Sequence, residues 1–141
     1  MALSMTTALR NSRSEEINTL IGAGGKVKFY SGPAPANVGA AATGDLLADC
    51  TCNASGFGTV TSGVLEADVV SGQSYVARDS SANNTGTIGY ARITDSSGNA
   101  VLQFSTVGTT GSGQEIELPS IFITAGEAVE VVSISITEGN S

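Results

Sequence analysis

Two cysteines separated by one residue, Cys50 and Cys52, are by type the most reactive side chains in this sequence. On a β-strand both thiols lie on one face, with Cα atoms about 6.5–7 Å apart from the strand rise. That separation is at the edge of disulfide geometry, and a metal site would need two further soft ligands. The chain has no other cysteine and no histidine. We therefore expect two small buried apolar residues, which bound zinc or a disulfide between them would contradict.

Carboxylates also occur in pairs separated by one residue, Glu66 with Asp68 and Glu115 with Glu117. On a strand each pair shares one face, where it could serve glycoside hydrolysis or bind calcium. A glycosidase normally lines its cleft with aromatic rings, whereas this chain has no Trp and no calcium-loop spacing. We expect these pairs to face solvent and to protect sheet edges.

Nucleophilic catalysis finds no support in the remaining residues. Without histidine there is no Ser-His or Cys-His arrangement, and no basic residue stands in a motif that would activate a serine. The glycine run at residues 22–25 follows a predicted helix instead of opening one, so it lacks the context of a phosphate-binding loop. The sequence therefore predicts no enzyme, no cofactor and no bound metal.

The net charge and its distribution limit the classes of partner that the protein is expected to bind. The 141 residues carry a net charge of −7, which argues against nucleic acid as a partner. Residues 1–44 have a balance of +2 and residues 45–141 one of −9, which could orient the protein on an acidic partner or be a chance asymmetry. Neither a signal peptide nor a membrane-spanning run is recognisable, so we expect synthesis and retention in a cytoplasm.

One helix is predicted, near the amino terminus. Ser12 to Glu15 matches a capping box, although the helix could begin as early as Thr6, and Gly22 supplies its end. The apolar residues at helical spacing on one face are Leu9, Ile17, Leu20 and Ile21. Residues 1–5 are expected to form a loose arm. The predicted organisation is an arm and helix over residues 1–25 and one compact β-sandwich domain over residues 26–141.

From residue 26 the apolar period becomes two, which is typical of strands. Candidate strand segments lie at residues 26–30, 46–52, 57–60, 64–70, 74–78, 88–94, 101–104, 115–118, 121–124 and 127–137, with a loop at residues 31–45. The last strand changes phase near Val131 and Val132, as a β-bulge would. Short strands with regular turns favour a mainly β fold, a jelly-roll-like antiparallel β-sandwich of about eight strands with one amino-terminal helix.

Residues 88–104 show the clearest hairpin pattern. Tyr90 and Arg92 share a face with Ile88, so we expect Arg92 to pair across a sheet or an interface and not to act on a substrate. Asp95 opens the short turn and is expected to cap it through bonds to nearby backbone amides.

Four strings together resemble a known family: ALRNSRSEEINTLI, KVKFYSGPAP, TGTIGYARITDSSGNAVLQ and ITAGEAVEVVSISITEGN. They look like small structural proteins of tailed bacteriophages, and within that set most like the cement, or decoration, proteins of the capsid. The resemblance runs over nearly the whole chain.

The resemblance implies a jelly-roll-like virion protein, made in the host cytoplasm, that forms a homodimer or homotrimer. It would bind the outer capsid surface and clamp neighbouring subunits of the major capsid protein. A rigid module that spans two subunits raises the cost of their sliding, and many modest contacts stabilise the shell through multivalency.

Two segments are the predicted contacts. One is the apolar and basic arm and helix, with Leu3, Met5, Leu9, Arg10 and Arg13, for which a frayed terminus is the alternative. The other is the loop at residues 32–36, where Pro33 and Pro35 lower the entropy that binding would cost. Deleting residues 1–13 is expected to leave the β-domain folded and to abolish capsid binding.

Other functions stay open at this point. The chain could instead be a tail, neck or baseplate component, since nothing in the residues distinguishes these positions. A carbohydrate-binding β-sandwich is a further alternative, although the shortage of aromatic residues weighs against it.

Overall fold

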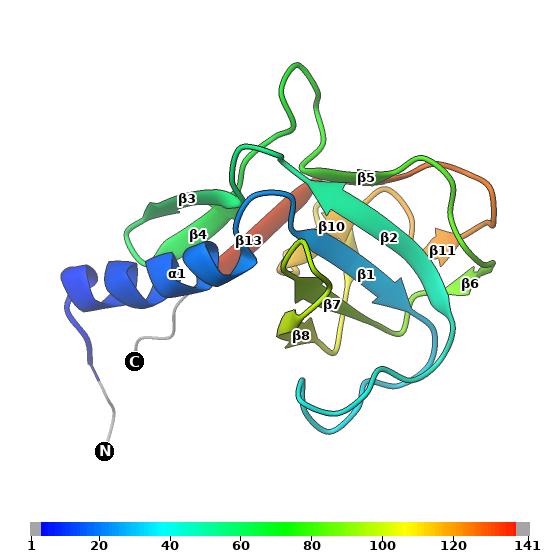
Figure 1. The fold of residues 1–141 in the computed structure, drawn as a ribbon, viewed down its shortest axis with the longest axis horizontal. Helices are drawn as coiled ribbons and strands as arrows, with labels where there is room; N and C mark the ends of the chain where they lie inside the picture. The colour runs from blue at the N-terminus through cyan, green and yellow to red at the C-terminus, as the bar shows by residue number, and fades with distance from the viewer. Residues whose placement is uncertain (1–3, 138–141) are drawn as a thin grey trace.

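The protein folds as one helix followed by thirteen short strands in a computed structural model that describes residues 4–137 (Figure 1). The helix and the first strands are α1 Thr7–Ile21, β1 Lys26–Tyr30, β2 Leu46–Cys52, β3 Gly58–Thr61, β4 Val64–Ala67, β5 Ala77–Asp79 and β6 Gly86–Thr87. The remaining strands are β7 Tyr90–Thr94, β8 Ala100–Phe104, β9 Gly108–Thr109, β10 Ile116–Leu118, β11 Phe122–Ile123, β12 Val129–Val131 and β13 Ser133–Thr137. The predicted mainly β class with one amino-terminal helix is confirmed.

The strands form two larger sheets and one small one. The six-stranded sheet has the order β12-β5-β2-β1-β7-β8, and the five-stranded sheet has the order β3-β4-β13-β10-β9. β11 and β6 form a separate pair. Neighbouring strands are antiparallel apart from β9 and β10, which run parallel.

One buried cluster lies beneath both larger sheets. From the six-stranded sheet it takes Val27, Phe29 and Ile93, and from the five-stranded sheet Leu65, Ile116 and Ile134. These side chains are at most 1% exposed, so the sheets share one core.

The predicted alternation along β1 is confirmed, because Val27 and Phe29 are buried between half-exposed neighbours. Along β2 the prediction was partly wrong, because Leu47 is buried together with Ala48. The β1–β2 register shifts opposite Phe29, and this irregularity breaks the strict alternation of β2.

The predicted carboxyl-terminal strand is two strands that belong to different sheets. β12 pairs with β5 in the six-stranded sheet, and β13 pairs with β4 and β10 in the other. The predicted phase change falls at Val132, which lies between the two strands. The amide of Val132 donates to the carbonyl of Glu117. The chain thus changes sheet where the sequence pattern predicted a bulge.

The helix begins earlier than the capping box predicts. Thr6 is the N-cap, and its hydroxyl accepts from the Leu9 amide at 3.2 Å. At the other end Gly22 has a φ of 66°, and its amide donates to the Asn18 carbonyl, which confirms the predicted stop. The capping box was wrong because Ser12 lies mid-helix, where hydrogen bonds between backbone groups leave no amide for its hydroxyl to cap. Within residues 4–137 no helix has the length and apolar character that crossing a membrane requires.

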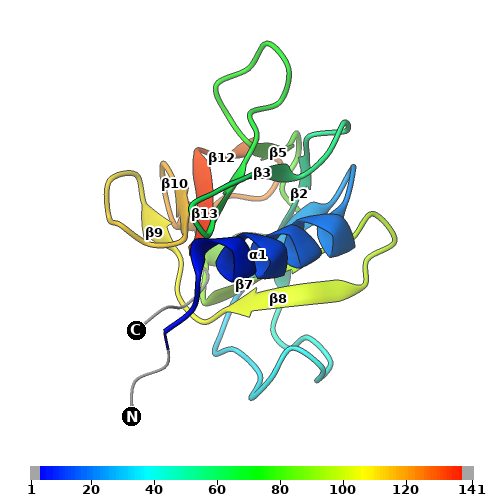
Figure 2. The same cartoon turned by 90° about the vertical axis from the view of Figure 1, so that its left-hand side faces the viewer.

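The helix packs beside β3 and β4, near one end of the molecule (Figures 1 and 2). Ile21 is buried and Ile17 half-buried, whereas Leu9 and Leu20 are 47% and 54% exposed. The predicted apolar face is therefore buried only in part.

Candidate interaction surfaces

The loop at residues 31–45, which we call the proline loop, is fixed to the β7–β8 hairpin by three polar side chains. The Arg92 guanidinium donates from Nη2 to the Ala40 carbonyl at 2.7 Å. Gln103 Nε2 donates to the Pro35 carbonyl at 2.9 Å. The Tyr90 hydroxyl donates to the Thr43 carbonyl at 2.7 Å and accepts from the Thr43 amide at 2.9 Å. A segment without regular strands or helices is thus held at three points along its length.

Arg92 is the central anchor because the residue as a whole is almost completely removed from water, at 6% exposure. Its Nε donates to Gln103 Oε1 at 3.0 Å, so the two side chains that hold the loop also hold each other. A hydrogen bond from a charged donor is stronger than one from a neutral donor. If such a bond is buried, its loss leaves an unsatisfied polar group, which destabilises the fold. The expected pairing of Arg92 across the sheet is confirmed by Gln103, which lies opposite it on β8.

Close packing fixes the start of the same loop. The Tyr30 and Tyr90 rings stack with centroids 5.0 Å apart, and burial, with a contribution from Tyr90, raises the pKa of Tyr30. Beside them Gly89 donates from its amide to the Tyr30 carbonyl. A Cβ on Gly89 would lie 1.8 Å from the Gly32 carbonyl oxygen, so no side chain fits there.

The outer surface of the proline loop is small and uncharged. Residues 31–44 contain no charged side chain. Of the two predicted contact residues, Pro33 is exposed and Pro35 is half-buried. The loop therefore presents a neutral surface whose shape is fixed before any partner binds.

The predicted contact residues of the arm and helix are distributed differently. Leu3 lies outside the described residues. Leu9 and Arg13 are exposed, Met5 is half-buried, and Arg13 donates to the Met5 sulfur at 3.1 Å. Arg10 is half-buried, and a Cβ on Gly63 would come within 2.8 Å of its guanidinium carbon. Arg10 is thus packed against the turn between β3 and β4.

Polar contacts hold the helix on that hairpin. Asn18 Nδ2 donates to the Gly58 carbonyl at 3.0 Å, and Asn18 Oδ1 accepts from the Gly58 amide at 3.1 Å. Asn11 Oδ1 accepts from the Gly63 amide at 2.7 Å, and the buried Ser14 hydroxyl donates to the Gly63 carbonyl at 3.2 Å. The helix is therefore part of the folded domain, and a deletion of residues 1–13 would remove some of its attachment.

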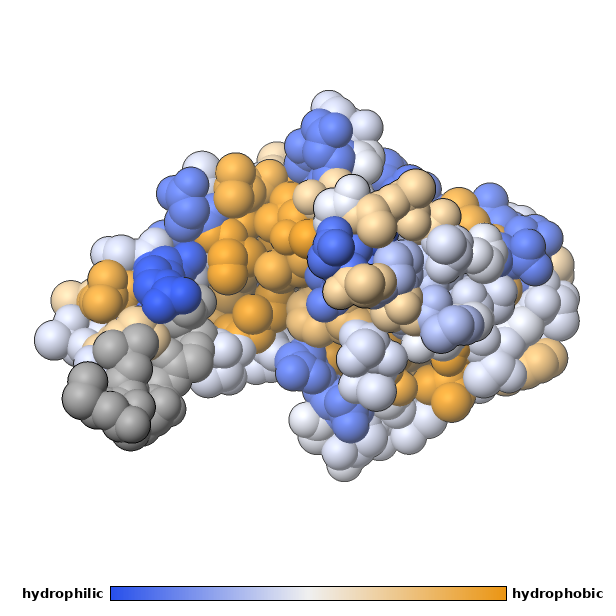
Figure 3. Space-filling model, turned by 90° about the horizontal axis from the view of Figure 1, so that it is seen from below, coloured by the Kyte–Doolittle hydropathy of each residue, from blue (hydrophilic) through white to orange (hydrophobic). Residues whose placement is uncertain are grey.

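The structure does not bring the two predicted groups together. The helix lies beside β3 and β4, whereas the proline loop hangs below β7 and β8 (Figures 1 and 2). Seen from below, a hydrophobic area lies between the side that carries the helix and the centre of the molecule (Figure 3). α1 and β8 border this side, and their half-buried apolar side chains include Ile17, Leu102 and Phe104.

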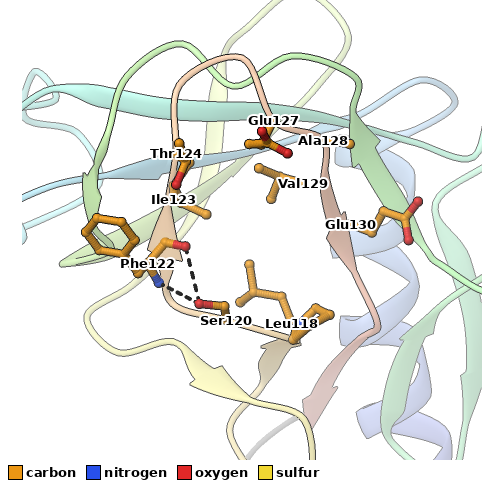
Figure 4. Close-up of a pocket in the computed structure, with 10 residues that line it drawn as sticks. Leu118, Ser120, Phe122, Ile123, Thr124, Glu127, Ala128, Val129 and Glu130 are labelled. Atoms are coloured by element: carbon orange, nitrogen blue, oxygen red, sulfur yellow. Dashed lines mark hydrogen bonds between the residues drawn. The ribbon is translucent and has the colours of Figure 1, made fainter.

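A cavity of about 390 Å³ lies at the opposite end of the molecule from the helix, between β11 and β12 (Figures 1 and 4). Leu118, Ile123 and Val129 form its apolar floor and are at most 6% exposed. Glu127 lies at its rim and Phe122 points away from it (Figure 4). No pattern in the sequence predicted this cavity.

The remaining candidate groups have structural roles. Cys50 and Cys52 are buried and free, as expected, and burial raises the pKa of Cys52 to about 12. Asp95 Oδ1 accepts from the Ser97 and Asn99 amides, which confirms that it caps the β7–β8 turn. Within residues 4–137 no three His, Cys, Asp or Glu side chains gather in a way that could hold a metal ion.

Comparison of the chain with protein-family models, curated proteins and solved structures gave no match.

Proposed function

We propose that this chain is a non-enzymatic virion structural protein, a cement protein that binds the outer surface of a phage head. In this role it clamps neighbouring subunits of the major capsid protein. The observation that carries the proposal is the proline loop, which is neutral over residues 31–44 and is anchored by the buried Arg92. A preformed surface of small residues suits contact with another protein, because little entropy is lost when it binds.

The underside of the molecule supports the same proposal. The proline loop extends from this side, and the hydrophobic area lies between it and the helix (Figures 1 and 3). Exposed apolar residues next to polar ones are typical of protein contacts. We assign this face to the capsid, with Pro33 of the loop and Leu9 of the helix as contacts.

The proposal includes a jelly-roll-like arrangement of the sandwich and assembly into a homodimer or homotrimer. Either oligomer would let one particle bind several capsid subunits at once, so that modest contacts add up. Measurement of the mass in solution, before contact with a shell, tests this part.

The main experiment measures co-sedimentation of purified protein with phage heads that lack it. We expect the wild type to bind, and Ala36→Glu, which places a carboxylate on the exposed loop, to bind at least about tenfold more weakly. The matched control is Ala54→Glu, on an exposed turn elsewhere. If Ala36→Glu and Ala54→Glu bind phage heads equally well, the proline loop is not part of the capsid contact.

For the helix, point substitutions test the contact better than a truncation, because Arg10 and Asn11 help attach the helix. Leu9→Ser is expected to weaken head binding, whereas Val69→Ser, which changes a similarly exposed apolar residue outside the helix, is expected to leave it unchanged. Imaging of particles that carry the protein shows whether it lies on the head or on the tail. Density on a tail, neck or baseplate would assign it there instead.

A further inference from the structure

β11 and β12 are edge strands that lie on either side of the same cavity. Within residues 4–137, β12 ends the six-stranded sheet, and β11 pairs only with β6. The two strands are consecutive in the chain, run in opposite directions and are not hydrogen-bonded to each other (Figure 4). Edge strands carry backbone donors and acceptors that can pair with a further strand.

On β11 the open side is occupied by a single hydroxyl. The Ile88 amide donates to the Ile121 carbonyl on the β6 side at 2.8 Å. By the two-residue alternation of a strand, the amide and carbonyl of Phe122 point away from β6. There the Ser120 hydroxyl accepts from the Phe122 amide at 3.1 Å and donates to its carbonyl at 3.3 Å. One serine side chain thus stands where a neighbouring strand would bind.

The same alternation defines the open side of β12. The carbonyls of Glu127 and Val131 accept from the amides of Ala82 and Val76, each at 2.9 Å, on the β5 side. The amide and carbonyl of Glu130 therefore point to the other side, toward the cavity.

We propose that this slot between β11 and β12 binds an extended segment of a partner protein by strand addition. Backbone pairing with the two edges would hold the segment, as in other sheets that accept an added strand. Apart from Glu127 and Glu130, the cavity lining offers backbone groups and an apolar floor, which favours a peptide over a small polar ligand.

Charge defines the side chains of that segment. Glu127 is exposed at the rim, and within residues 4–137 its carboxylate has no hydrogen bond or ion pair. Residues 45–141, which contain both edge strands, have a charge balance of −9. The segment is therefore one that places an apolar side chain on the floor of Leu118, Ile123 and Val129 and a Lys or Arg at the rim. This site is separate from the face assigned to the capsid and does not depend on that assignment.

The probe is a library of random peptides displayed on phage, selected on the folded wild-type protein. We expect enriched peptides with alternating apolar residues and at least one Lys or Arg. An end-blocked synthetic copy of the best peptide is then titrated by fluorescence anisotropy. In the complex, hydrogen exchange at the amides of Phe122 and Glu130 should slow, because strand addition turns both into ladder donors.

Two variants test the slot by different routes. Ala128 lies two residues before Glu130, so its amide also points to the open side of the strand. Ala128→Pro therefore removes an amide on the open side and keeps the hydrogen bonds to β5. It should lower peptide affinity at least about tenfold. Glu127→Lys should lower the affinity of basic peptides about threefold at low salt, whereas Glu115→Lys, at an exposed site elsewhere, should not.

Three results would overturn the proposal. They are no enriched peptide family, a bound peptide that leaves exchange at Phe122 and Glu130 unchanged, and equal affinity for wild type and both slot variants. Amide spectra of each variant confirm its fold, and if Ala128→Pro does not fold, the Glu127→Lys and Glu115→Lys pair still decides the question.

Discussion

The proline loop and helix α1 were both predicted as contact surfaces, yet they are fixed in opposite ways. The loop has no regular secondary structure, but its backbone is bonded to the side chain of Arg92, which is 6% exposed. The helix is regular, but its main links to the β3–β4 hairpin are neutral polar contacts, such as the half-buried pair between Asn18 and Gly58. Leu9 and Leu20, which could have packed on the core, face solvent.

The difference shows that the rigidity of a surface depends on where its anchors lie more than on the regularity of its backbone. A buried charged donor without its acceptors costs more than an exposed neutral one. We therefore expect the loop to be the more preorganised surface and the helix to be the more easily detached one. The following experiments separate the two surfaces, starting with the largest effect.

Arg92→Met should have the largest effect, because it leaves the Ala40 carbonyl and the Gln103 side chain without their buried donor. We expect a loss of about 3 kcal/mol in the free energy of unfolding, measured by urea denaturation. Hydrogen exchange should rise in residues 31–45 and stay unchanged in α1.

The matched control is Arg78→Met, which removes an arginine with a 39% exposed side chain from an ion pair with Glu130 at 3.2 Å. An exposed pair contributes little, so this change should cost less than about 1 kcal/mol. If the two variants lose equal stability, Arg92 is not a buried anchor and the comparison fails.

Asn18→Ala should have the next largest effect, a loss of about 2 kcal/mol, because one side chain makes both bonds to the Gly58 backbone. The hydrogen-exchange pattern should be the reverse of that of Arg92→Met. Exchange should become faster in α1 and stay unchanged in the proline loop. Thr19→Ala, on the exposed side of the helix, is the control. Faster exchange in both regions would mean that helix and loop unfold together.

Tyr90→Phe should cost about 1 kcal/mol, since it removes one hydroxyl that bonds both the amide and the carbonyl of Thr43. Tyr30→Phe keeps the ring stack and removes a hydroxyl that makes no such bond within residues 4–137, so it should be nearly neutral. Limited proteolysis between residues 40 and 45 should distinguish the two variants. Equal cleavage would show that stacking, and not the hydroxyl, holds this end of the loop.

The sequence predicted what local patterns encode. Alternation predicted the buried face of β1 and the pairing of β7 with β8, and Gly22 predicted the end of the helix. Alternation did not predict that β7 is buried at all five positions, and therefore on both faces. The sequence left two helix starts open, the capping box at Ser12 and an earlier one at Thr6, because the residues from Ser12 to Glu15 fit a helix interior as well as a start. Only the structure shows that Thr6 supplies the cap.

The anchors and the slot could not be read from the sequence because they depend on long-range placement. Arg92 reaches a carbonyl 52 residues away, and Gln103 reaches one 68 residues away. Every residue has a backbone carbonyl, so the residue type does not show which carbonyl accepts a hydrogen bond. No sequence pattern therefore indicated Ala40 or Pro35 as acceptors. The slot likewise requires that β11 and β12 join different sheets, which short-range alternation does not specify.

Asp95 provides the smallest effect and the sharpest contrast with Arg92, because it fixes the β7–β8 turn with an exposed carboxylate. Bonds from the amide and side chain of Asn99, together with one from the Ser97 amide, lower the pKa of Asp95 below its ordinary value of 3.8. A group with a lowered folded-state pKa stabilises the protein above its unfolded pKa, and this contribution disappears as the pH falls through the folded value. The stability difference between wild type and Asp95→Ala should therefore be largest near neutral pH and shrink below pH 3.8.

Comparison of the two proteins at each pH cancels the titration of the other carboxylates. Asn99→Ala removes one of the donors, so a carboxyl titration followed by NMR should give Asp95 a pKa closer to 3.8 in that variant. If the difference between wild type and Asp95→Ala does not change with pH, the charge of Asp95 has no part in the turn. An anchor in water would then act by shape alone, whereas the buried anchor of the proline loop acts through its charge.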